Sequence, residues 1–70
     1  MKLKQLPSSK ELYTHPDNVV GGVGVEIIKD DKKYFIKTIT FQGREYNVYD
    51  DKHNYLFSFQ THNDLKNWYR

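Results

Sequence analysis

The sequence contains neither Cys nor Ala, and each absence restricts the possible folds. There is no Cys, which excludes disulfide bonds and thiolate metal sites, so stability must come from packing or from association with a partner. There is also no Ala, the strongest helix former, whereas β-branched and aromatic residues are plentiful: five Val, four Ile, four Thr, six Tyr and four Phe. Such side chains fit a half-buried pleated surface, so the composition predicts a fold dominated by an antiparallel sheet.

Long apolar runs are missing as well. Mean hydropathy is −0.87, and no stretch approaches the ~18 apolar residues of a membrane helix. Residues 1–7 also lack the apolar centre of a signal peptide. Together with the lack of Cys, these features predict a cytoplasmic protein that does not bind a membrane.

The charged residues are nearly balanced in sign. There are 11 Lys and Arg against 9 Asp and Glu, which gives a net charge of +2. Positive and negative residues alternate, as in residues 29–33, instead of forming blocks. A binder of duplex DNA usually carries a basic stripe, because each neutralised phosphate releases counterions. The charge pattern therefore indicates a solvated surface and argues against a dedicated duplex binder.

Turn residues divide the middle of the chain into strand-like segments. These cover about residues 23–28, 33–41, 44–49 and 55–60. Asp30 and Asp31 are expected to form a two-residue hairpin turn, because Asp tolerates left-handed backbone geometry, and Gly43 is expected to have a positive φ in the next turn. Connections this short cannot be parallel crossovers, so the sequence predicts an antiparallel β-meander.

The N-terminal segment carries one helix signal. Ser8 and Glu11 have the spacing of a capping box, which predicts a short helix over about residues 8–14 that ends before Pro16. The polar composition is equally compatible with an arm that has no regular structure. We therefore divide the chain into an N-terminal arm or short helix, residues 1–18, and a single compact domain, residues 19–70.

The C-terminal segment is predicted to be a helix. Leu65, Trp68 and Tyr69 lie at i, i+3 and i+4, on one helix face. A helix of two turns is marginal alone, so we expect Leu65 and Trp68 to pack against Val and Ile side chains of the sheet. The predicted fold is α+β, a four-stranded antiparallel meander with a short C-terminal α-helix on one face and a short N-terminal helix or arm.

Apolar residues occur on both faces of the predicted strands. In residues 33–41, Phe35 and Ile39 alternate with Tyr34 and Ile36. The C-terminal helix is expected to cover one face. The other face needs the N-terminal segment, curvature of the sheet or a second molecule to cover it.

The three histidines do not have the spacing of a metal or catalytic site. His15, His53 and His62 contain no pair at i, i+4 on a predicted helix or at i, i+2 on a predicted strand, where local metal ligands are usually found. We expect them to be loop or cap residues.

Other short motifs give no catalytic prediction either. The Asp pairs at 30–31 and 50–51 lie in predicted turns, where adjacent side chains point apart. The glycine-rich residues 20–24 lack a following Lys-Ser or Lys-Thr pair and lead into a strand, which is unlike a phosphate-binding loop. We therefore expect a non-enzymatic protein with no cofactor and no metal.

Aromatic and basic residues that interleave along the predicted sheet are the strongest surface signal. Amphipathic aromatic surface is typical of protein interfaces, and rings beside cations also suit single-stranded nucleic acid. We expect an interaction module that binds a protein partner or self-associates through an aromatic sheet face; the alternative is a single-stranded nucleic-acid-binding protein. The candidate binding residues are Tyr34, Ile36, Tyr46, Tyr49 and Tyr55, with the basic Lys33, Lys37 and Arg44.

Overall fold

The computed structural model describes residues 5–19 and 22–70 of the chain. Residues 1–4 of the predicted N-terminal arm lie outside the described residues, as do Val20 and Gly21 of the glycine-rich stretch.

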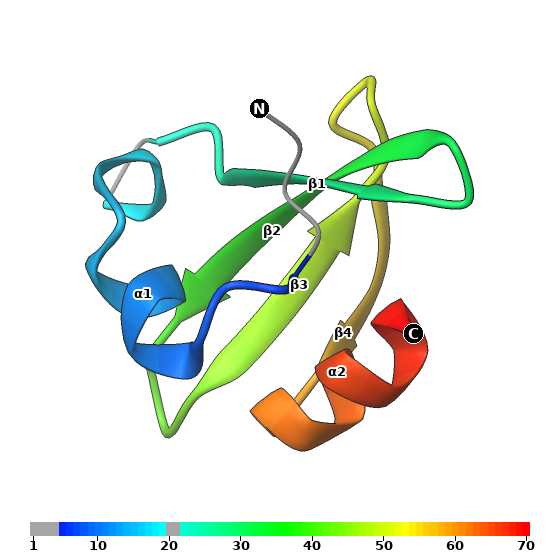
Figure 1. Cartoon of the computed structure of the whole chain (residues 1–70). Helices are drawn as coiled ribbons and strands as arrows, with labels where there is room; N and C mark the ends of the chain where they lie inside the picture. Colours follow the sequence, from blue (N-terminus) through cyan, green and yellow to red (C-terminus); the bar gives the residue numbers. More distant parts are fainter. Residues whose placement is uncertain (1–4, 20–21) are drawn as a thin grey trace.

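The described residues form one antiparallel sheet and two short α-helices (Figure 1). The strand order is β1-β2-β3-β4, which confirms the predicted meander and the α+β class. None of the described helices is both long enough and apolar enough to cross a membrane. In chain order the elements are α1 (Ser9–Thr14), the 3-10 helix η1 (Pro16–Asn18), β1 (Val25–Lys29), β2 (Lys32–Ile39), β3 (Glu45–Tyr49), β4 (Tyr55–Phe59) and α2 (His62–Tyr69).

The hairpin turns form where the sequence predicts them. Asp30 and Asp31, between β1 and β2, have φ angles of 52° and 64°, as the two-residue turn requires. Gly43, between β2 and β3, has a φ of 112°, and its N–H donates to the carbonyl of Thr40 at 3.3 Å. Because the chain turns from Thr40 onward, β2 ends at Ile39. Phe41 therefore lies in the turn, 81% exposed, and not in the strand as predicted.

Gly24 explains why β1 begins at Val25 and not at Val23. Its φ is 96°, and a Cβ at this position would lie 3.0 Å from the carbonyl oxygen of Ile36. Only glycine accommodates both conditions without strain. The backbone of β2 therefore approaches Gly24 closely, at Ile36.

The first helix has the predicted capping box. The hydroxyl of Ser8 accepts a hydrogen bond from the Glu11 N–H at 3.1 Å, and the Glu11 carboxylate accepts one from the Ser8 N–H at 3.4 Å. The helix ends at Thr14, because His15 has an extended backbone and Pro16 follows it. Residues 9–14, capped by Ser8, thus form the predicted helix in place of an arm without regular structure.

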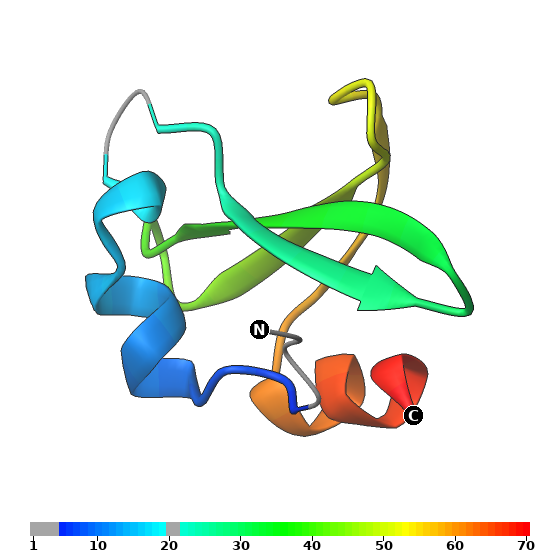
Figure 2. The same ribbon diagram turned by 45° about the horizontal axis from the view of Figure 1, so that its top comes forward.

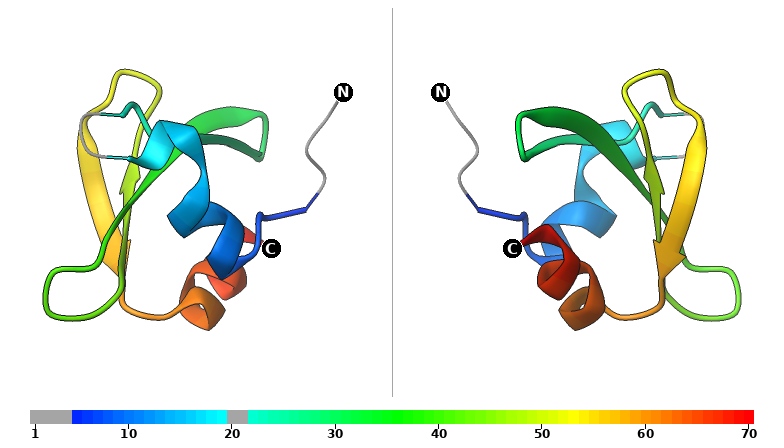
Figure 3. Two further views of the ribbon diagram at one scale, coloured as in Figure 1. Left: turned by 90° about the vertical axis from the view of Figure 1, so that its left-hand side faces the viewer. Right: turned by 90° about the vertical axis from the view of Figure 1, so that its right-hand side faces the viewer.

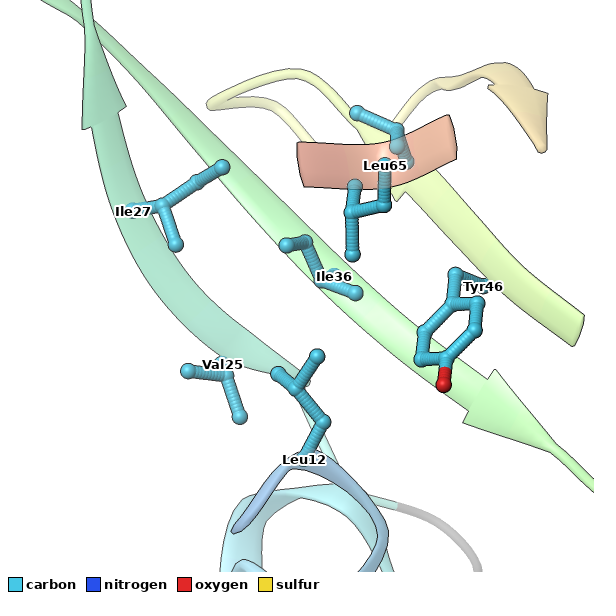
Figure 4. Close-up of a cluster of buried hydrophobic side chains, with 7 residues drawn as sticks. Leu12, Val25, Ile27, Ile36, Tyr46 and Leu65 are labelled. Carbon is cyan, nitrogen blue, oxygen red and sulfur yellow. The ribbon is translucent and has the colours of Figure 1, made fainter. Parts of the chain in front are cut away.

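Both helices pack on the same face of the sheet, which we call the inner face (Figures 2 and 3). Leu12 of α1 and Leu65 of α2 belong to the same fully buried cluster as Ile36 of β2 (Figure 4). The α1 helix of the N-terminal segment, which was one of the expected covers of the second face, therefore packs on the same face as α2. The buried cluster consists of Leu12, Val25, Ile27, Ile36, Tyr46, Val48 and Leu65.

Trp68 closes the α2 end of this core. Its ring centroid is 5.3 Å from that of Tyr34, 5.4 Å from that of Phe57 and 6.0 Å from that of Phe59. Leu65 is completely buried, whereas Trp68 is only partly buried at the rim. Leu65 and Trp68 both pack against the core, as predicted. The close neighbours of Trp68 also include three aromatic rings, whereas the prediction named only Val and Ile side chains.

Candidate functional site

The sheet face opposite the helices, which we call the outer face, carries the candidate site. Side chains alternate between the two faces along a strand, and the buried Ile36 and Val48 identify the inner set. The residues between them in sequence point outward, and the register places them beside outward residues of the next strand. The outer face consists of Glu26 and Ile28 on β1, Lys33, Phe35, Lys37 and Ile39 on β2, Glu45, Asn47 and Tyr49 on β3, and Tyr55 and Ser58 on β4.

Phe35, Tyr49 and Tyr55 form a row of rings across three strands, which we call the aromatic row. Phe35 pairs with Tyr49, and Tyr49 pairs with Tyr55. The two Tyr rings lie 5.8 Å apart with their planes inclined by 73°, and Tyr55 is 57% exposed. A register shift leaves Leu56 without a paired residue on β3, and this bulge brings Tyr55 to the outer face.

The loop between β3 and β4 adds an imidazole to the aromatic row. His53 has a φ of 66°, and its ring stacks on that of Phe35 with centroids 4.4 Å apart and planes 19° from parallel. A positive φ at a residue other than glycine is uncommon and needs support from its surroundings. That support comes from Asp50, whose backbone carbonyl accepts a hydrogen bond from the His53 N–H at 3.0 Å.

Asp50 holds the whole loop in place. Its carboxylate accepts hydrogen bonds from the backbone N–H of Asn54 at 2.8 Å and from that of Lys52 at 2.9 Å. The side-chain amide of Asn54 donates a further bond at 3.1 Å. The bonds from Asn54 hold the pKa of the Asp50 carboxyl below its ordinary value. A charged Asp50 therefore positions His53 against Phe35.

A polar row runs beside the aromatic row. Lys37, Asn47 and Ser58 pair across β2, β3 and β4. The Lys37 ammonium lies over the Tyr49 ring, 4.6 Å from its centroid, which is a cation–π contact. A groove of about 680 Å³ lies beside this contact, and its lining includes Lys37, Tyr49 and Phe41.

The remaining outer-face residues are aliphatic or oppositely charged. Ile28 is 45% exposed and Ile39 is 42% exposed. Lys33 lies 3.7 Å from a carboxylate oxygen of Glu26. The outer face therefore combines the aromatic row and the adjacent polar row with single aliphatic residues and charges of both signs.

Four of the predicted binding residues do lie on the outer face: Lys33, Lys37, Tyr49 and Tyr55. The expected exposure is wrong for Ile36 and Tyr46, which are 0% and 1% exposed in the core. Tyr34 lies on the same inner face, and its ring contacts Trp68. The physical reason is the two-residue period of a strand, which places Tyr46 and Tyr49, three residues apart, on opposite faces.

Arg44 also lies away from the outer face. Its guanidinium donates a hydrogen bond to the Ser9 hydroxyl at 2.8 Å and lies over the Tyr13 ring, 5.0 Å from the centroid. Arg44 therefore attaches α1 to the β2–β3 hairpin, and it does not share a surface with Lys33 and Lys37.

Five residues on or beside the outer face were not predicted from the sequence: Ile28, Phe35, Ile39, Asn47 and His53. Strict alternation from Tyr49 would have selected Asn47, and its pairing partners would have selected Phe35. His53 gave no comparable signal, because its contact with Phe35 depends on the folded loop.

The three histidines make separate contacts. The ring of His15 caps η1 by accepting a hydrogen bond from the Asp17 N–H at 3.1 Å, while His62 Nε2 lies 2.9 Å from the carbonyl oxygen of Pro7. Within residues 5–19 and 22–70, no group of three His, Asp or Glu residues is placed to hold a metal ion.

Comparisons with known proteins give no functional information, since no family model, curated protein or solved structure matches this chain.

Proposed function

We propose that this protein is a small, non-enzymatic interaction module that binds a protein partner through the outer face. The observation that supports this most strongly is the placement of both helices on the inner face, which leaves the aromatic row of Phe35, Tyr49 and Tyr55 without a described helix against it. A contiguous apolar patch on a protein this small marks an interaction site.

The composition of the outer face suits a protein partner. The aromatic row crosses three of the four strands, and aromatic anchors supply much of the binding energy in protein interfaces. The charges of the outer face have both signs, as in the pair of Lys33 with Glu26. Charge of both signs favours a specific protein surface, a second copy of this chain included, over a uniformly anionic ligand.

Single-stranded nucleic acid is the second candidate. Lys37, Asn47 and Ser58 stand directly beside the aromatic row, and together such groups can bind phosphates and base edges while rings stack on bases. Two contacts argue against the binding of single-stranded nucleic acid. His53 already covers part of the Phe35 ring, and the Lys37 ammonium already covers part of the Tyr49 ring.

The proposed module acts in the cytoplasm and needs no cofactor. The absence of Cys supports the location, because a reducing compartment deprives small domains of disulfide bonds. The sequence contains no catalytic or metal-binding residue pattern, which supports the proposal that the module needs no cofactor.

The test compares the size of complexes formed by matched variants. We expect the labelled wild type to sediment as a larger species in lysate of the native cell than at the same concentration in buffer, and the double variant Tyr49→Ser, Tyr55→Ser to lose this difference. Val23→Ser is the control, because Val23 is an exposed apolar residue that precedes β1 and belongs neither to the outer face nor to the groove beside it. Equal behaviour of the double variant and the control would contradict the proposal.

The nucleic-acid alternative is tested with labelled single-stranded oligonucleotides. If it is correct, binding weakens steeply with salt, and each lost ring costs ~1–3 kcal/mol of binding free energy. Lys33→Ala and Lys37→Ala should then reduce the salt dependence, whereas Lys10→Ala on α1 should leave it unchanged.

A further inference from the structure

The strand β4 lies at an edge of the sheet and pairs with β3 alone among the described elements. Its other side therefore presents unpaired backbone N–H and C=O groups. Its side chains remain open to solvent too, since Tyr55 is 57%, Leu56 40% and Phe57 36% exposed.

The two edges of the sheet differ in chemistry. The strand at the opposite edge, β1, carries the charged Glu26 and Lys29 and follows Gly24, features that discourage pairing with another strand. The sequence Tyr-Leu-Phe-Ser-Phe of β4 contains no charge, no Pro and no Gly. Gln60, which follows it, is also uncharged. Such a segment is favourable for the addition of a further strand.

We infer that β4 pairs in antiparallel fashion with β4 of a second copy of this chain, so that two sheets join into one continuous sheet. This inference concerns the edge of the sheet and is independent of binding at the outer face. A second copy is the occupant because β4 is complementary to itself: no charge opposes its like in the pairing, and the net charge of +2 per chain repels a second copy only weakly.

The bulge fixes the register of this pairing. Leu56 is the irregular residue, so the regular part of the edge begins at Phe57. A two-fold axis at Ser58 uses this regular part and places Phe57 opposite Phe59 of the second copy, both on the inner face. Phe57 already contacts Phe59 of its own chain at 5.5 Å and Trp68 at 5.4 Å, so a ring from the second copy extends an existing aromatic cluster.

The test uses opposite charges at the two-fold axis. In Ser58→Lys, two like charges face each other in a homodimer, and the same holds for Ser58→Glu. Facing like charges are costly, so we expect the dissociation constant of each homodimer to rise by about tenfold or more. When the two variants are mixed, Lys faces Glu, and we expect the dimer to return in sedimentation velocity measurements.

Asn47→Lys is the matched control. It adds the same charge beside Ser58 on the outer face, but on β3 and away from the edge. We expect it to dimerise like the wild type. Loss of the dimer in Asn47→Lys as well as in Ser58→Lys would assign association to the outer face and overturn the edge pairing. A wild type that stays monomeric over a hundredfold concentration range would overturn it too, as would a mixture of folded variants that fails to recover the dimer; far-UV circular dichroism verifies the folding.

Discussion

The imidazole of His53 lies nearly parallel to the ring of Phe35, with the two centroids 4.4 Å apart. One residue comes from a loop and the other from a strand, and the contact joins the β3–β4 loop to the outer face. The hydrogen bonds of Asp50 keep the loop in the conformation that this contact needs. The outer face is therefore an organised surface that the fold maintains, and its parts can be tested separately.

Asp50 is predicted to make stability dependent on acid pH. Its pKa is lower in the folded protein than the ordinary value of 3.8, mainly through the hydrogen bond from the Asn54 N–H. A lowered folded pKa means that the contribution is complete above the unfolded pKa and is lost as the pH falls through the folded pKa. We expect Asp50→Asn to lower the Tm at pH 7 and the difference from the wild type to shrink below about pH 4.

Thermal melts of both proteins over a pH series measure this difference. Asp51→Asn is the control, because Asp51 is the adjacent acidic residue in the same loop, whereas Asp50 accepts the hydrogen bonds from Lys52 and Asn54. A Tm difference for Asp50→Asn that is constant from pH 7 to about pH 2 would show that the charge of Asp50 does not organise the loop.

Leu12 is predicted to be essential to the core although α1 has only six residues. Leu12 is completely buried with Leu65, and truncation of a buried Leu to Ala costs ~2–5 kcal/mol, a large part of the stability of a small domain. Leu56→Ala is the matched control, since Leu56 is 40% exposed, and it should cost well under half as much. Urea unfolding of both variants decides the matter: equal losses would mean that α1 does not belong to the core.

The two glycines with positive φ are predicted to differ in their tolerance of a side chain. Gly43→Ala should cost only about 1 kcal/mol, the conformational cost of a positive φ, because no atom beyond the two adjacent residues lies within 4 Å of the added Cβ. Gly24→Ala adds a clash with the backbone of Ile36, 3.0 Å from the Cβ, so its cost should be clearly larger. Chemical denaturation ranks the two variants, and the reverse order would contradict the described approach of β1 to β2.

The fold was predictable because its signals are local. The Asp30–Asp31 turn, the capping box of Ser8 with Glu11 and the turn at Gly43 each depend on residues that are adjacent or nearly adjacent in sequence. Such preferences act before any long-range contact forms.

The candidate site was predictable only in part, because side-chain alternation defines two faces without deciding which one the helices cover. That choice depends on how Leu12 and Leu65 pack with Ile36, which is a long-range contact. The grouping of Tyr46 with Tyr49 has a different cause. A separation of three residues in one strand excludes a shared face, so strict alternation would have separated them. The stacking of His53 on Phe35 lies beyond sequence reasoning, since it requires the folded loop.

Lysine footprinting tests the central claim, that the outer face is the binding surface, most directly. Lys33 and Lys37 lie on this face, whereas Lys10 of α1 and Lys66 of α2 lie on elements that cover the inner face. The protein is acetylated under limiting conditions, first alone and then in lysate of its native cell, and the modified lysines are quantified by mass spectrometry. We predict that the lysate slows acetylation of Lys33 and Lys37 and leaves Lys10 and Lys66 unchanged. Protection of Lys10 or Lys66 in their place, or no protection at any of the four, would contradict the account.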